Sequence, residues 1–224
     1  MTVAAAVALA ALVLAALVVA TWAAVWRAAP RVEMVTKPLA LLALIALAVT
    51  LGAPGTDVGV SVLVALGLAL VGDVFLLGSG ARSFVGGLGA FLLSDLAYLV
   101  AFVMLGFHWI PALVVLVLAL FVLRTAGHRV QAGATREGGP WLGGGTTAYM
   151  LVLSALAVTA AGTALPLVLA GALVFLVSDL VLGLDRFVGP RARADLVVMV
   201  TYHVGQVLMV VGALTSATAS SGLR

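Results

Sequence analysis

The sequence predicts an all-α polytopic membrane protein, a bundle of eight transmembrane helices. Hydrophobic residues make up 65% of the 224 residues and charged residues only 8%, whereas a soluble domain uses charged residues at about one position in four. The mean hydropathy is +1.33. Apolar runs long enough to cross a hydrocarbon core of roughly 30 Å recur along the whole chain. We therefore expect a single integral membrane domain over residues 1–224.

Eight apolar runs are candidate spans, judged by the rise of about 1.5 Å per helical residue. In chain order they are approximately 3–21, 38–53, 58–77, 84–105, 109–123, 146–163, 165–184 and 196–214. The second and fifth runs are short and two breaks are tight, so seven spans remain an alternative. Pro38 is expected to open the second helix, where proline is favoured. The longest connection, 124–145, is rich in Gly and Arg, which predicts a flexible loop.

The distribution of positive charge favours eight spans. Alternate connections then lie on opposite faces of the membrane, and ten of the eleven Lys and Arg residues fall in the odd-numbered connections. Only Arg224 lies elsewhere. The positive-inside rule places the odd connections in the cytoplasm and both termini outside it. We expect the protein in the inner (cytoplasmic) membrane. The basic residues are too scattered for a nucleic-acid surface, so no nucleic-acid partner is expected.

Two aspartates inside apolar runs are the candidate catalytic residues. Burying an ionisable group in a membrane is costly, so Asp73 and Asp179 indicate a functional site. Both lie about 6 Å from the cytoplasmic ends of the third and seventh spans, which run in the same direction. We expect them to face one another in a pocket open to the cytoplasm. Repulsion between two such carboxylates keeps one protonated while its partner is anionic, and which is which stays open.

Further polar side chains gather in the same half of the membrane. Asp95 and Tyr98 share a helix face about 16 to 21 Å from the cytoplasmic end of the fourth span, and the polar group of the last span lies about 9 to 15 Å in. Such residues can also be packing residues with a satisfied polar atom. The candidate substrate-binding residues are Lys37, Asp95, Tyr98, Tyr202, His203 and Gln206. Without cysteine or an HxxxH pattern, neither a metal nor a cofactor is predicted.

Several motifs, taken in order, resemble the YhhN family of membrane lysoplasmalogenases. They are Thr36-Lys37-Pro38-Leu39, then Gly72-Asp73, then 84–91 followed by Tyr98, then 171–179 ending in Ser178-Asp179, and finally Thr201-Tyr202-His203 with Gln206. The resemblance runs from about Lys37 to Leu208. Each motif is short, but their order and spacing across the spans make the combination specific. Many relatives have a histidine at the position of Asp95.

This resemblance implies hydrolysis of the vinyl ether bond of a lysoplasmalogen, with membrane lipids and a lysophospholipid substrate as partners. The products would be a fatty aldehyde and glycerophosphoethanolamine or glycerophosphocholine. The reaction needs a proton donor and a base that activates water, which two aspartates can supply. Lys37, Arg186, Arg191 and Arg193 would lie near the lipid phosphate, although the positive-inside bias explains these charges equally well.

Two other classes of protein also bury acidic residues in membrane helices. An intramembrane aspartyl protease would use paired aspartates, but Leu70 replaces the first glycine of its GxGD motif, and serine rather than tyrosine precedes Asp179. A small proton-coupled transporter would be expected to have broken helices near the membrane centre, whereas these runs are mostly continuous. The oligomeric state stays open.

Overall fold

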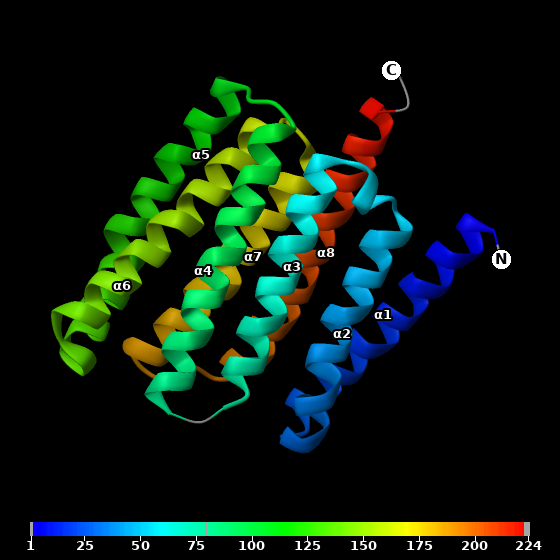
Figure 1. Cartoon of the computed structure of the whole chain (residues 1–224). Helices are drawn as coiled ribbons and strands as arrows, with labels where there is room; N and C mark the ends of the chain where they lie inside the picture. The colour runs from blue at the N-terminus through cyan, green and yellow to red at the C-terminus, as the bar shows by residue number, and fades with distance from the viewer. Residues whose placement is uncertain (1, 79, 222–224) are drawn as a thin grey trace. The chain divides into compact units, whose positions relative to one another are not determined.

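The computed structural model describes residues 2–78 and 80–221, and these residues form helices joined by short turns, without strands (Figure 1). The α-helices are α1 (Val3–Trp26), α2 (Pro30–Thr50), α3 (Asp57–Leu76), α4 (Ala81–Met104), α5 (Trp109–Val122), α6 (His128–Gly162), α7 (Pro166–Phe187) and α8 (Ala194–Ser221). A 3-10 turn, η1 (Ala53–Gly55), precedes α3, and a π-helical segment, η2 (Leu123–Gly127), joins α5 to α6.

Seven helices among the described residues are long and apolar enough to cross a membrane, so the chain is a polytopic membrane protein. The fifth of them, Trp109–Gly162, is 54 residues long and contains α5, η2 and α6. It is interrupted at Gly138 (φ −128°, ψ 19°) and Gly139 (φ 71°, ψ −172°). The second of these conformations is open essentially to glycine alone. The chain therefore folds back here, and α5 and α6 lie side by side (Figure 1).

The prediction of a flexible loop over residues 124–145 is wrong, because this stretch is helical except at the two-glycine turn. Threonine hydroxyls satisfy their own hydrogen-bonding groups within the helix by donating to carbonyls four residues earlier, at 2.9 Å from Thr135 and 2.8 Å from Thr146. Glycine also lets the two arms of the turn meet, since a Cβ on Gly143 would lie 2.0 Å from the Thr135 hydroxyl. Glycine content indicated mobility, but here it permits close packing of helices.

The second helix begins earlier than expected, at Pro30 rather than Pro38. Pro30 occupies the first helical position and Glu33 lies in the first turn, where a negative charge complements the helix dipole. Pro38 is inside the helix. The hydroxyl of Thr36 donates to the Val32 carbonyl at 3.0 Å, the kind of local bonding with which membrane helices tolerate a proline. As a result, Lys37 lies within α2 instead of at its start.

The chain forms two compact units, Met1–Leu105 with Val210–Arg224, and Gly106–Met209. In the first unit α2 packs against α1 and α3, and α3 packs against α4. Thr56 caps α3 by accepting a hydrogen bond from the Gly59 amide at 3.0 Å. Gly72 allows a close approach of α3 and α4, because a Cβ there would lie 2.8 Å from the ring of Phe91. This packing fixes the end of α3 that carries Asp73.

In the second unit α6 packs against α5 and α7. Two glycines bring α7 and the first part of α8 into contact. A Cβ on Gly171 would lie 2.7 Å from the Met209 amide nitrogen, and one on Gly205 would lie 2.9 Å from the Phe175 amide nitrogen. Small residues facing each other in this way are typical of close helix crossings in membranes. The crossing holds the helix that carries Asp179 against the helix that carries Tyr202.

Candidate active site

The first aspartate forms a buried ion pair. Lys37 Nζ, from α2, lies 3.1 Å from Asp73 Oδ1, from α3, and the two side chains are only 5% and 1% exposed. The pair joins two neighbouring helices of the first unit. The contact offsets part of the cost of burying the two charged groups away from water. The sequence identified both residues as functional candidates but did not pair them.

The helix α4 contributes two further buried candidates to the first unit. Asp95 and Tyr98 are both 0% exposed. Because they are three residues apart, they project from the same side of the helix. Tyr98 packs near Phe102, with ring centroids 5.8 Å apart. The neighbouring Ser94 donates to the Ala65 carbonyl at 2.8 Å, which fastens α4 to α3. The two candidates therefore lie in the interior of the protein on a helix held firmly in place.

The second aspartate is held by a tyrosine that the sequence reasoning missed. The Tyr149 hydroxyl, from α6, donates a hydrogen bond to Asp179 Oδ2, from α7. Tyr149 is buried and Asp179 only partly so. Ser178 donates to the Val198 carbonyl at 3.0 Å and ties the same turn of α7 to α8. Asp179 is thus fixed from both sides within the second unit.

The polar residues of α8 also lie in the second unit. Tyr202, His203 and Gln206 are all buried. The ring of Tyr202 lies 5.3 Å from that of His203 and 5.9 Å from that of Phe175 on α7, measured between centroids. Tyr202 therefore packs against α7, and all three side chains belong to the interior.

The structure divides the predicted site between the two units. Lys37, Asp73, Asp95 and Tyr98 belong to the first; Asp179, Tyr202, His203 and Gln206 belong to the second. Asp73 in the first unit and Asp179 in the second each have a partner from a neighbouring helix. The expected pairing of the two aspartates with each other stays a prediction.

Two of the basic residues expected near a lipid phosphate, Arg186 and Arg191, already bind other groups of the protein. Arg186 binds Glu137 of α6 through both of its terminal nitrogens, one of them at 2.7 Å. Arg191 donates to the carbonyls of Leu184 and Gly189, each at 2.8 Å. These arginines hold the end of α7 and the turn that follows it. Over residues 2–78 and 80–221, no group of three or more His, Asp or Glu residues is placed to hold a metal ion.

Fold and site together define a polytopic all-α membrane protein. Two aspartates of its membrane-spanning helices, Asp73 and Asp179, each contact a polar side chain from a neighbouring helix. Residues 32–213 match the YhhN family, and because the match covers most of the chain, the protein belongs to that family. The resemblance drawn from the short motifs is confirmed. No curated protein and no solved structure matches the chain.

Proposed function

We propose that this protein is a lysoplasmalogenase-type hydrolase that cleaves the vinyl ether bond of a lysoplasmalogen in the inner membrane. Characterised members of the YhhN family are lysoplasmalogenases. The observation that carries the proposal is the presence, in a member of this family, of two intramembrane aspartates with different partners, the Lys37 ammonium for Asp73 and the Tyr149 hydroxyl for Asp179. An acid and a base in one reaction need such unlike surroundings.

In the proposed reaction one carboxylic acid donates a proton to the outer vinyl carbon, and the positive charge spreads onto the ether oxygen. A carboxylate then takes a proton from water as the water attacks the carbon bonded to that oxygen. The hemiacetal collapses to a fatty aldehyde and a glycerol hydroxyl. One water is consumed, and the carbon–oxygen bond on the vinyl side is broken.

We assign the two roles from the partners of the aspartates. Asp73 is the carboxylate that stabilises the cation and activates water, because it is the aspartate that is ion-paired with Lys37. Asp179 is the proton donor. Among the described residues Tyr149 is its side-chain partner and binds Oδ2, which leaves Oδ1 for the transferred proton. Tyr149 is then a positioning residue. We further propose that the other buried polar residues orient water or the glycerol end of the lipid; these are Asp95, Tyr98, Tyr202, His203 and Gln206.

Three substrates that differ at one bond test the proposed reaction. Purified protein is incubated with a lysoplasmalogen, an ester lysophospholipid and a saturated alkyl-ether analogue with the same headgroup. Aldehyde release is expected from the lysoplasmalogen alone, because only the vinyl ether has a double bond that can accept the proton. Turnover of none of the three, or of the ester alone, would contradict the proposal.

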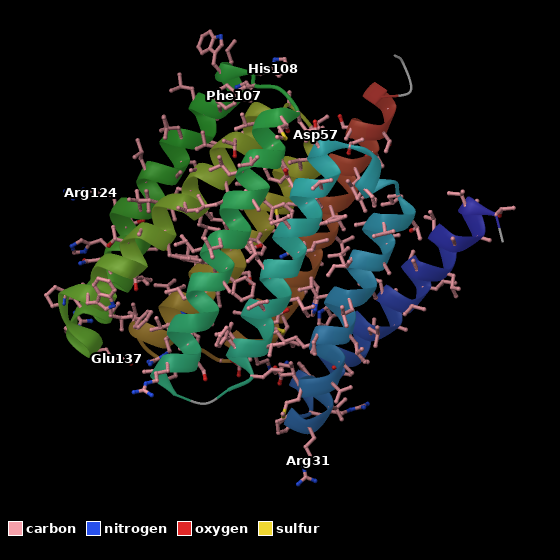
Figure 2. All side chains as sticks on the ribbon, viewed as in Figure 1. Arg31, Asp57, Phe107, His108, Arg124 and Glu137 are labelled. Carbon is pink, nitrogen blue, oxygen red and sulfur yellow. The ribbon has the colours of Figure 1, made fainter. Side chains whose placement is uncertain are left out.

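We also propose that the chain crosses the membrane eight times, with both termini outside the cytoplasm. The turn at Gly138 and Gly139 divides Trp109–Gly162 into arms of about 44 Å and 35 Å at 1.5 Å per residue, each long enough to cross. His108 and Glu137 lie at opposite ends of this hairpin in Figure 2. The positive-inside rule puts the turn end in the cytoplasm.

Single cysteines report this topology cleanly, because the chain has no cysteine of its own. Phe107 and Trp141 are 54% and 88% exposed, and they lie in connections expected on opposite faces. In sealed spheroplasts a membrane-impermeant maleimide should label Phe107→Cys and should label Trp141→Cys only after lysis. Labelling of Trp141→Cys before lysis would exclude this orientation.

A further inference from the structure

The second unit contains a groove that the proposed reaction does not use. It lies between α5, η2 and α6 and has a volume of about 500 Å³. Its walls include Leu120, Leu123, Arg124, His128, Met150 and Leu151. This volume is within the range of sites that bind small molecules. Leu120 and Leu151 are 55% and 54% exposed, so the groove opens at the surface of the unit.

The groove is apolar at one end and polar at the other. Along the α5–η2 wall, Leu120 is followed by Arg124 and His128 at steps of four residues, which keeps the three on one side of the helix. Gln131 continues the polar end. The π-helical turn of η2 lies where apolar lining gives way to polar lining, and such turns are frequent at functional sites.

The position of the polar end along the helix matches the membrane interface. Trp109 begins α5 and is 68% exposed, as expected for an aromatic side chain at one membrane surface. Arg124 is fifteen residues further on, or about 22 Å along the helix, and His128 is about 28 Å along it. With a hydrocarbon core of roughly 30 Å, both residues lie in its last third, on the side of the opposite surface, and the long side chain of Arg124 can extend from there toward the phosphates. Figure 2 shows Arg124 projecting from the hairpin.

Arg124 supplies the positive charge of the groove and has no acidic partner among the residues that the structure describes. In the part of the chain that the structure describes, the side chains of Arg124 and His128 make no hydrogen bond or ion pair, in contrast to Arg186 with its partner Glu137. The groove lining contains no acidic residue. An anionic oxygen at the interface would complement this end, while a hydrocarbon chain would cover Leu120 and Leu151 at the other.

We propose that this groove binds one phospholipid with a net negative headgroup, its phosphate at Arg124 and its acyl chain along Leu120 and Leu151. The site is separate from Asp179. Thr147 and Leu151 face the groove from one side of α6, whereas Tyr149 reaches α7. A second copy of the chain is a poorer occupant, because a twofold contact through this face would bring the cations of both copies together.

Competition between two lipids tests the site by native mass spectrometry of the purified full chain. Equimolar phosphatidylglycerol and phosphatidylcholine of the same chain length are added to the detergent-solubilised protein. The wild type should retain phosphatidylglycerol preferentially, and Arg124→Gln should lower that preference about fivefold, the effect of roughly one interfacial cation. Arg124→Lys should retain most of it.

Arg129→Gln is the matched control, since Arg129 is exposed, lies on the same helix and does not line the groove. It should leave the preference unchanged. Equal retention of the two lipids by the wild type overturns the proposal, as does an equal loss in the Arg124→Gln and Arg129→Gln variants. If the wild type is dimeric and the Arg124→Gln variant is monomeric, the proposal is also overturned, because a second copy of the chain then occupies this face. Circular dichroism of each variant checks that the helices are intact.

Discussion

Replacement of Asp179 by Asn is expected to reduce lysoplasmalogen hydrolysis by about 10³-fold, within the range of 10²- to 10⁴-fold that positioned acid–base groups contribute. The amide has nearly the shape of the carboxyl group and still offers an oxygen to the Tyr149 hydroxyl. It cannot donate the proton that the vinyl carbon needs. Aldehyde release from purified protein, at saturating substrate, measures the loss.

Asp73→Asn should cause a loss of similar size, because it removes the carboxylate that stabilises the cation and activates water. Asp57→Asn is the control, since Asp57 begins the same helix α3 but is exposed at its other end. It should keep near-normal activity. Retention of more than about a tenth of the wild-type rate by either Asp73→Asn or Asp179→Asn would falsify the role assigned to that residue.

Replacement of Lys37 by Met is expected to impair both stability and activity. The substitution removes the ammonium that lies 3.1 Å from the buried carboxylate of Asp73. Removing one partner of a buried ion pair costs about 3 to 5 kcal/mol. Thermal unfolding in detergent should show a clear fall in the midpoint temperature, and turnover should be largely lost.

The double variant Lys37→Met with Asp73→Asn separates the two effects. Without either charge the buried pair is replaced by two neutral side chains, so most of the stability should return. Activity should stay absent, since the carboxylate is gone. A double variant as unstable as Lys37→Met alone would show that the ion pair is not what Lys37 contributes to folding.

Much of the fold could be predicted because the apolar runs are long and the polar residues between them are few. The predicted run 58–77 and helix α3, Asp57–Leu76, differ by one residue at each end. The predictions failed where a segment is helical without being strongly apolar. Residues 124–145 are too polar and glycine-rich to predict a membrane helix, yet they are helical on both sides of the two-glycine turn and form part of both arms of a hairpin. Pro38 resembled a helix start, but Pro30 serves as one.

The site could be predicted in its residue types more fully than in its contacts. An isolated carboxylate in an apolar run is visible in the sequence, and so Asp73 and Asp179 were identified. The partner of each comes from another helix and depends on packing that no local pattern records. Tyr149 did leave a signal. It lies about 5 Å from the cytoplasmic end of the predicted run 146–163, which is close to the depth of Asp179. Comparing the membrane depths of polar residues, as was done for the two aspartates, would therefore also have identified Tyr149.

The proposed reaction requires that Asp73 and Asp179 act on the same substrate molecule. Because the chain has no cysteine, the variant Asp73→Cys with Asp179→Cys can be treated with a short bifunctional thiol reagent, and intramolecular cross-linking can be measured by mass spectrometry. Lys37→Cys with Asp73→Cys is the positive control, because those side chains are in contact. We predict efficient cross-linking of both pairs. Cross-linking of the control pair with none between positions 73 and 179 would contradict the shared role of the two aspartates.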